Sequence, residues 1–99
     1  MAIIEDFYQK VVNITSCVCD VDPDLMFRSN REPYVDARSL VIMRLAANGY
    51  SDNRISCLTG LTRQAVNHIR NTFPHRFNRS WMLITYDKQI SIELAKEFQ

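Results

Sequence analysis

The chain has 99 residues, of which 46% are apolar and 23% are charged, a composition typical of one compact globular domain spanning residues 1–99. No apolar run approaches the roughly 20 residues that a membrane-spanning helix needs, so no membrane partner is expected. The first residues include Glu5 and Asp6, where a secretory signal would carry basic and then apolar residues. This pattern indicates a cytoplasmic protein.

The chain has three cysteines, which could form disulfides, and two histidines, which with the cysteines could bind a metal ion. Cys17, Cys19 and Cys57 are odd in number, and a chain this rich in apolar residues does not depend on disulfide bonds, so reduced thiols are expected. Cys17 and Cys19, taken with His68 and His75, lack the Cys-x-x-Cys and His-x-x-x-His spacings of a zinc site. The sequence therefore predicts neither a bound metal nor a cofactor.

The net charge of +1 is unevenly distributed along the chain. Residues 1–27 carry −4, residues 28–79 carry +6, and residues 80–99 carry −1, and every basic residue of the middle stretch is an arginine. Arginine suits phosphate groups and guanine edges because its planar guanidinium group donates two parallel hydrogen bonds. About a third of these arginines are expected to pair with neighbouring acids. The others favour an anionic partner.

The first half of the chain predicts two helices separated by a short helix and a basic loop. A first helix should end near Cys19, because apolar residues recur at helical spacing up to that point: Ile4, Phe7, Val11, Ile14 and Val18. Asp22 and Pro23 predict the start of a very short helix over 22–27. Segment 28–33 has no apolar residue and predicts an exposed loop. Segment 34–48 is almost wholly apolar and predicts the most buried helix.

The second half predicts three further helices. Ser51 should cap a short helix that Gly60 ends, and Thr62 should cap the next helix, which Pro74 should end. These two helices form a helix-turn-helix pattern at about 51–73. A closing helix at about 79–98 is favoured over a strand because apolar residues recur there at helical spacing: Leu83, Tyr86, Ile90, Leu94 and Phe98.

The second helix of the pair has one apolar side and one polar side. Its apolar residues are Ala65, Val66, Ile69 and Phe73. The opposite side carries side chains that can hydrogen-bond base edges in the major groove, arginine to guanine and asparagine or glutamine to adenine. The predicted base contacts are Arg63, Gln64, Asn67, His68 and Asn71. This pattern predicts an all-α protein that binds double-stranded DNA, with this helix in the major groove.

Other basic residues are expected to contact the DNA backbone or the minor groove, where they set affinity more than specificity. Thr62, whose capped helix start favours a phosphate, belongs with them. The predicted set is Arg28, Arg31, Arg54, Thr62, Arg70, Arg76 and Arg79. Arg38 and Arg44 lie inside the central helix and are expected to be structural.

Two other classes of function were weighed against DNA binding. An enzyme is not expected, because there is no paired carboxylate motif or nucleophile elbow, and only His68 and His75 offer near-neutral bases. The serious alternative is a protein interaction module, since helix-turn-helix shapes also occur in such modules. In that case Trp81 to Tyr86 would form an exposed docking surface instead of core, and burial of Trp81 would argue against it.

Residues from about Val11 to Ile69 resemble the C-terminal DNA-binding domain of the bacterial replication initiator DnaA. The resemblance lies in Asp22-Pro23-Asp24-Leu25, in the basic stretch Arg28-Ser29-Asn30-Arg31, in the helix around Ala37-Arg38 and Leu45, and in the spacing of Ser51, Ile55, Gly60 and Val66. It implies an all-α fold with a helix-turn-helix, like that of the DnaA C-terminal domain and the Trp repressor. It also implies that Arg31, with Arg28, enters the minor groove.

The chain departs from that family in two places. The family has Gly-Arg-Asp-His-Ser/Thr-Thr-Val where this chain has Gly60-Leu61-Thr62-Arg63-Gln64-Ala65-Val66, so the same groove but a different DNA sequence is expected. The chain also lacks a Gly-x-x-x-x-Gly-Lys-Ser/Thr loop, so no nucleotide is expected. The resemblance implies a stand-alone regulator of replication or transcription, encoded by a bacterium, phage or plasmid. Both a monomer and a self-associating protein remain open.

Overall fold

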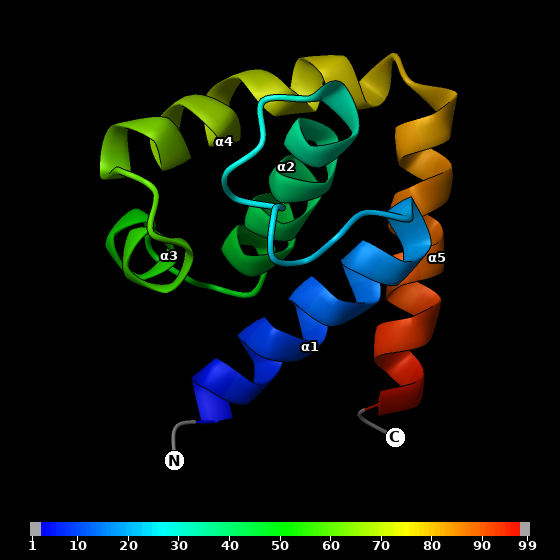
Figure 1. The fold of residues 1–99 in the computed structure, drawn as a ribbon, viewed down its shortest axis with the longest axis horizontal. Helices are drawn as coiled ribbons and strands as arrows, with labels where there is room; N and C mark the ends of the chain where they lie inside the picture. The colour runs from blue at the N-terminus through cyan, green and yellow to red at the C-terminus, as the bar shows by residue number, and fades with distance from the viewer. Residues whose placement is uncertain (1–2, 98–99) are drawn as a thin grey trace.

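The computed structural model describes the backbone of residues 3–97 and the side chains of residues 6–97 (Figure 1). In this part of the chain there are five α-helices and no strand, which confirms the all-α prediction. None of these helices is long and apolar enough to span a bilayer. The helices are α1 (Ile3–Cys19), α2 (Glu32–Ala47), α3 (Asp52–Thr59), α4 (Arg63–Asn78) and α5 (Trp81–Glu97).

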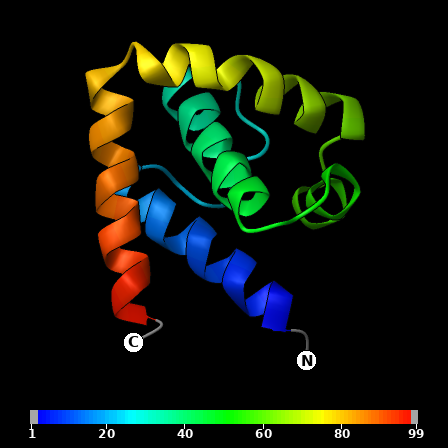
Figure 2. The ribbon, with the colours of Figure 1, turned by 180° about the vertical axis from the view of Figure 1, so that it is seen from behind.

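The helix α2 lies at the centre of the molecule and is the most buried, as predicted (Figure 2). It packs against α1, α3 and α4, while α1 and α5 pack against each other. All five helices contribute to one apolar cluster, and Val41, Ile42 and Leu45 of α2 are completely buried within it. Burying such side chains contributes about 1.5–3 kcal/mol each. The central helix therefore fixes the positions of the others.

The segment between α1 and α2 differs from its prediction. The helix α1 ends at Cys19, as expected, where Asp20 adopts a left-handed φ of 56°. The predicted short helix over 22–27 is wrong, because residues 23–28 form only consecutive turns. An Asp22 carboxylate oxygen does accept the backbone N–H of Asp24 at 2.9 Å, which is the predicted capping hydrogen bond, but the turns that follow do not continue into a helix. The turns are held to the core by Met26, whose side chain is completely buried.

Arg38 and Arg44 were expected to be structural, and the structure confirms this. The Arg38 guanidinium donates to the carbonyl of Met26 at 3.0 Å and to that of Ser29 at 2.5 Å, which ties the turn segment to α2. The Arg44 guanidinium donates to the Asp87 carboxylate and to the Ser91 hydroxyl, both at 2.7 Å. Arg44 therefore joins α2 to α5.

The prediction that Pro74 ends the second helix of the pair is wrong. The helix α4 continues through Pro74 to Asn78. Proline removes one N–H from the helix and costs about 3 kcal/mol in a helix interior. The side chains on either side of it favour continuation, because Phe73 is buried and Phe77 packs against the core, with their ring centroids 5.9 Å apart. Tertiary packing therefore outweighs the local signal.

The predicted closing helix is confirmed over the described residues, since α5 runs from Trp81 to Glu97, and Phe98 lies outside them. The Ser80 hydroxyl accepts the backbone N–H of Leu83 at 3.2 Å and so caps the helix start. Leu83, Ile90 and Leu94 are buried as their spacing predicts. Trp81 is not part of the core, because its side chain is 82% exposed.

A buried carboxylate near the start of α2 makes the stability of the fold depend on pH. Asp36 is 6% exposed and pairs with Arg76 of α4 at 2.9 Å, where the Arg76 guanidinium also lies over the Phe73 ring. Burial raises the pKa of Asp36, the Arg76 charge lowers it by less, and the Glu32 charge adds to the rise. The protonated form of Asp36 is therefore favoured by folding.

We expect Asp36→Asn to change the free energy of unfolding more favourably at about pH 7 than below pH 3.8, which is the ordinary pKa of an aspartate side chain. A raised pKa gives stability that is complete below the unfolded value and is lost as pH rises through the folded value. The amide cannot ionise, so it avoids that loss. Urea unfolding of both proteins at the two pH values measures the difference. An equal difference at both would mean that Asp36 acts only through hydrogen bonding and packing.

Candidate nucleic-acid interface

Three local signals position α3 and α4 relative to each other. The Ser51 hydroxyl caps α3 by accepting the backbone N–H of Arg54 at 3.1 Å, and the Thr62 hydroxyl caps α4 by accepting that of Ala65 at 3.0 Å. Gly60 ends α3 with φ of 81°, a conformation that L side chains rarely adopt. All three predicted signals are confirmed, and they leave a turn of only residues 60–62 between the helices.

The apolar sides of α3 and α4 face the core. Ile55 and Val66 are completely buried, and Leu61 of the turn packs against the cluster, as predicted. The opposite side of α4 faces solvent. All five predicted base-contacting residues lie exposed on it: Arg63, Gln64, Asn67, His68 and Asn71. Their exposure follows from the burial of Val66 and Phe73 on the other side of the same helix.

An open groove of about 540 Å³ lies where α3 meets the start of α4. It brings together three of the five predicted base-contacting residues, with neighbours from the start of α3. Its lining residues are Ser51, Asp52, Asn53, Arg63, Gln64, Asn67 and Arg70. His68 and Asn71 lie outside it on the exposed side of α4. Every residue that lines the groove has a polar or charged side chain, and the groove is bordered by the capped start of α4, where backbone N–H groups favour an anion.

Asp52 is the functional candidate that sequence reasoning missed. Its carboxylate accepts hydrogen bonds from the Arg70 guanidinium and from the Asn67 amide, the latter at 3.2 Å. The Asn67 amide oxygen in turn accepts from the Asn71 amide at 3.0 Å. The hydrogen bond from Arg70 is the largest cause that lowers the pKa of Asp52, followed by that from Asn67, with the Arg63 charge adding to the effect. Asp52 is therefore ionised at neutral pH.

The network centred on Asp52 changes what each side chain can offer a ligand. Among the described residues, no ion pair or side-chain hydrogen bond involves Arg63 or Gln64, so both keep their full capacity. Asn71 keeps its amide oxygen and one N–H, whereas Asn67 has used both ends of its amide. The only signal for Asp52 in the sequence was its place in the first turn of the preceding helix.

The predicted backbone-contacting residues are spread over several elements. Arg28 and Arg31 lie exposed before α2, Arg54 lies on α3, and Arg79 follows α4. None of these four lines the groove between α3 and α4. Thr62 caps α4 but keeps its hydroxyl hydrogen as a donor.

Two other predicted backbone contacts are held by acids of the protein itself. Arg70 pairs with Asp52, and Arg76 pairs with Asp36. With the pair between Arg44 and Asp87, three of the nine arginines are in ion pairs, which confirms the expected third. The charges of Arg70 and Arg76 are thus partly neutralised before any ligand binds, which weakens the case for them as phosphate contacts.

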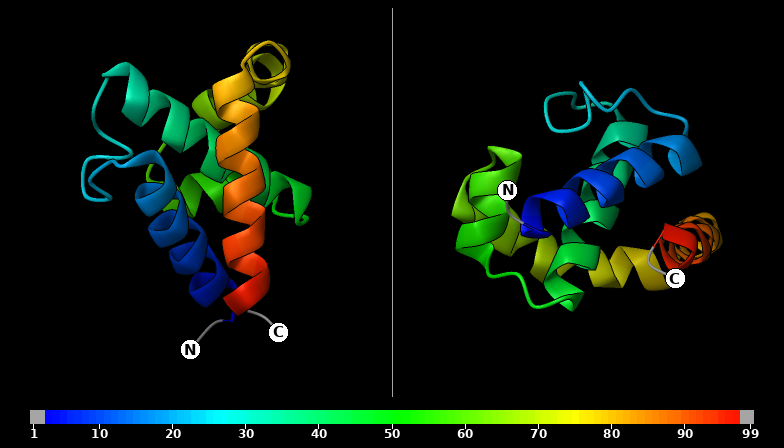
Figure 3. Two further views of the ribbon diagram at one scale, coloured as in Figure 1. Left: turned by 90° about the vertical axis from the view of Figure 1, so that its right-hand side faces the viewer. Right: turned by 90° about the horizontal axis from the view of Figure 1, so that it is seen from below.

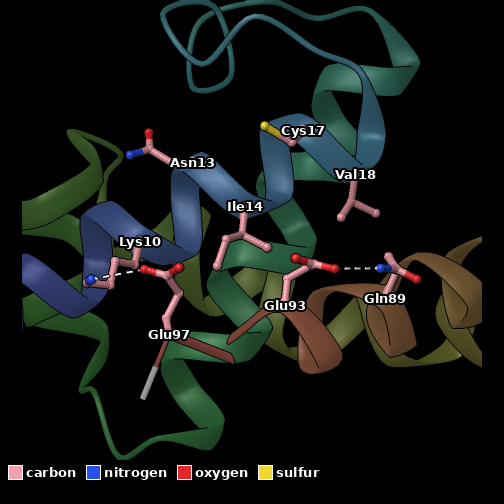
Figure 4. Close-up of a pocket in the computed structure, with 8 residues that line it drawn as sticks. All are labelled: Lys10, Asn13, Ile14, Cys17, Val18, Gln89, Glu93 and Glu97. Atoms are coloured by element: carbon pink, nitrogen blue, oxygen red, sulfur yellow. Dashed lines mark hydrogen bonds and ion pairs between the residues drawn. The ribbon is translucent and has the colours of Figure 1, made fainter. Parts of the chain in front are cut away.

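A second open groove, of about 510 Å³, lies between α1 and α5 (Figure 4). Its apolar wall is formed by Ile14 and Val18, and the Glu93 and Glu97 carboxylates lie opposite. Glu97 accepts from Lys10 at 3.1 Å, and Glu93 accepts from Gln89 at 2.9 Å. Two carboxylates facing one lysine make this groove a poor site for phosphate. The arginine-bearing groove between α3 and α4 is the better candidate for an anionic ligand.

The cysteines and histidines do not gather at either groove in a ligand set. Cys17 and Cys57 are exposed free thiols on different helices, and Cys19 is half-buried. Burial, with the nearby Asp36 charge, raises the pKa of the Cys19 thiol to about 11. Among the described residues, no three histidine, cysteine, aspartate or glutamate side chains lie close enough to hold a metal ion.

Comparison with models of protein families, with curated proteins and with solved structures returned no significant match. The resemblance to the DnaA C-terminal domain therefore stays a prediction from the residues quoted above. The functional assignment depends on the geometry of α3 and α4.

Proposed function

We propose that the protein binds double-stranded DNA in a sequence-specific manner, with α3 and α4 acting as a helix-turn-helix and the start of α4 entering the major groove. The supporting observation is the exposed start of α4 next to the cap of Thr62, where Arg63 and Gln64 make no side-chain hydrogen bond or ion pair with any residue that the structure describes. Helices of this motif present their N-terminal residues to base edges. An N-terminal helix end also attracts the flanking phosphates.

The side chains on this face have different roles in the proposal. Arg63 donates to guanine and Gln64 reads adenine, the pairings that their geometry favours. Asn71 keeps the donor and the acceptor that adenine recognition needs, whereas Asn67 positions Asn71. His68 lies at the margin of the contact. Arg28 and Arg31 take the minor-groove role that the DnaA-like arrangement implies, and Arg54 and Arg79 add phosphate contacts.

The resemblance extends this proposal to a cellular role. A DnaA-like DNA reader fits a regulator of replication or transcription in a bacterium, phage or plasmid. Its target differs from the origin box of that family, because Arg63 and Gln64 replace the histidine and the first hydroxyl residue of the family signature.

The test is a fluorescence-anisotropy titration against a randomised duplex pool at several salt concentrations, with sequencing of the retained fraction. A specific reader should enrich a defined motif, and its affinity should fall steeply with salt as counterions are released. Retention without enrichment would reduce the protein to a non-specific binder. No binding at low salt would reject the proposal.

Given DNA binding, we expect Asp52→Asn to strengthen non-specific binding and to weaken discrimination between sites. The change removes a negative charge from the interface and releases Arg70 towards the phosphates, which should steepen the slope of log K against log salt by about 1. Glu97→Gln is the matched control, since it removes the same charge at the far end of α5. Equal slopes for the two variants would show that Asp52 acts only through net charge.

A second candidate function, protein interaction, is favoured by one specific observation. Burial of Trp81 would have argued against a docking surface, but this residue is 82% exposed. Leu83 of the same segment belongs to the core. The start of α5 adjoins the C-terminal end of α4, whereas α3 adjoins its N-terminal end (Figure 1). The two functions therefore use different parts of the molecule and are compatible.

A further inference from the structure

The helix α5 carries most of the exposed large hydrophobic side chains that the structure describes. Among the described side chains, four large hydrophobic ones are exposed, and three of them are Trp81 (82%), Met82 (47%) and Ile92 (52%). Tryptophan is usually extensively buried, so an exposure of this size needs an explanation. Contiguous exposed apolar side chains mark interaction sites more often than single ones do.

These side chains lie on one side of the helix. Trp81, Thr85, Lys88 and Ile92 are spaced at i, i+4, i+7 and i+11, which forms a stripe opposite the buried Leu83, Ile90 and Leu94. We call this stripe, with Met82, the outer face of α5. The Thr85 hydroxyl donates to the Trp81 carbonyl at 2.9 Å, so it needs no partner from another molecule.

The only charged residue of the outer face is basic. Lys88 lies between Trp81 and Ile92, and no ion pair or side-chain hydrogen bond of the described residues involves it. Arg79 precedes the helix. The nearest acids are engaged elsewhere, because Asp87 pairs with Arg44 and Glu93 pairs with Lys96. A partner that covers Trp81 and Ile92 must also face the Lys88 ammonium group, which favours a carboxylate opposite it.

A second copy of this chain fits the outer face less well. Two-fold pairing would place the outer face against itself, and that face contains no acidic residue that could pair with Lys88. A lipid surface also fits less well, because an anionic membrane attracts clusters of basic residues, whereas α5 carries two lysines against three acids.

The outer face is separate from the proposed DNA-binding surface. The helix α4 has 16 residues and is therefore about 24 Å long, and it separates Arg63 from the start of α5. The view from below shows α5 and α3 on opposite sides of the molecule, with α2 between them (Figure 3, right). DNA on the α3–α4 side would leave the outer face of α5 free for a second partner.

We propose that the outer face of α5 binds an acidic amphipathic segment of a partner protein, with Trp81 as the anchoring side chain. The partner packs apolar side chains on Trp81, Met82 and Ile92 and places a carboxylate near Lys88. Interfaces concentrate their affinity in a few residues, tryptophan foremost among them. This binding does not depend on DNA, so it is tested without DNA.

The test uses a displayed library of tryptophan-free helical peptides, selected against the full chain. Enriched peptides should carry an apolar stripe flanked by aspartate or glutamate. Trp81 is the only tryptophan of the chain, so its emission should shift to the blue when a selected peptide binds. Trp81→Ala should weaken binding at least about tenfold. Lys88→Glu should also weaken it, and Gln9→Ala on α1 should not. Circular dichroism checks that each variant is folded.

Several outcomes would overturn the proposal. These are no enrichment of peptides, enrichment of basic peptides, and binding that survives Trp81→Ala. A blue shift that depends on protein concentration alone would assign the outer face to a second copy. A blue shift produced by vesicles containing phosphatidylserine, and not by acidic peptides, would assign it to a membrane surface.

Discussion

Replacing Arg44 by leucine should destabilise the fold by about 1.5–3 kcal/mol, the usual range for hydrogen bonds to a charged group. The Arg44 guanidinium donates to the Asp87 carboxylate at 2.7 Å, to the Asp87 carbonyl at 3.2 Å and to the Ser91 hydroxyl at 2.7 Å. Leucine keeps the apolar part of the side chain against α5 but removes the donor from the Asp87 carboxylate and from the Ser91 hydroxyl oxygen, while the Asp87 carbonyl still accepts from the Ser91 hydroxyl at 3.0 Å. More than half of the Asp87 side chain is shielded from solvent, so water can replace the lost hydrogen bonds only in part.

Urea unfolding followed by circular dichroism measures this loss, because Trp81 is already exposed in the folded state and its fluorescence reports unfolding poorly. Arg79→Leu is the matched control, since Arg79 is exposed and its side chain makes no hydrogen bond or ion pair among the described residues, and it should change stability by less than about 0.5 kcal/mol. Arg44→Lys should retain part of the stability, because an ammonium group cannot reach all three acceptors in the same geometry. Equal losses for Arg44→Leu and Arg79→Leu would show that Arg44 does not hold α5 to α2.

The sequence predicted the structure best where the deciding interactions are local. Ser51, Gly60 and Thr62 act within three residues of their own position, through capping hydrogen bonds and a left-handed turn. Pro74 is also a local signal, but its effect depends on whether Phe73 and Phe77 gain more by staying helical than the missing hydrogen bond costs. That balance depends on tertiary packing, which the local sequence does not show. The helix end was therefore predicted five residues too early.

The predicted base contacts all lie on one helix. The spacing of Val66 and Phe73 identified the exposed side of α4, because one helix face determines the other. Asp52 lies on a different helix, and its contacts with Asn67 and Arg70 depend on how α3 and α4 cross. Hydrophobic spacing gives no information on that crossing. The spacing of the buried residues of α5 places Trp81 on the exposed side of that helix. The apolar residues of the first turn hide this pattern in the sequence.

Given DNA binding, Arg63→Ala is expected to weaken binding to the selected site by about 1–3 kcal/mol, or about 5- to 150-fold, while binding to random duplex changes little. Arg63 stands at the start of α4, is exposed, and makes no ion pair among the described residues, so its loss leaves no buried acid unpaired. Anisotropy titrations of both duplexes at one salt concentration measure the two losses. Arg70→Ala is the matched control on the same helix: its guanidinium already pairs with Asp52, so its removal should affect both duplexes to a similar, smaller extent. If Arg63→Ala weakened both duplexes equally, Arg63 would be a phosphate contact, and the reading of bases would have to be assigned to Gln64 and Asn71.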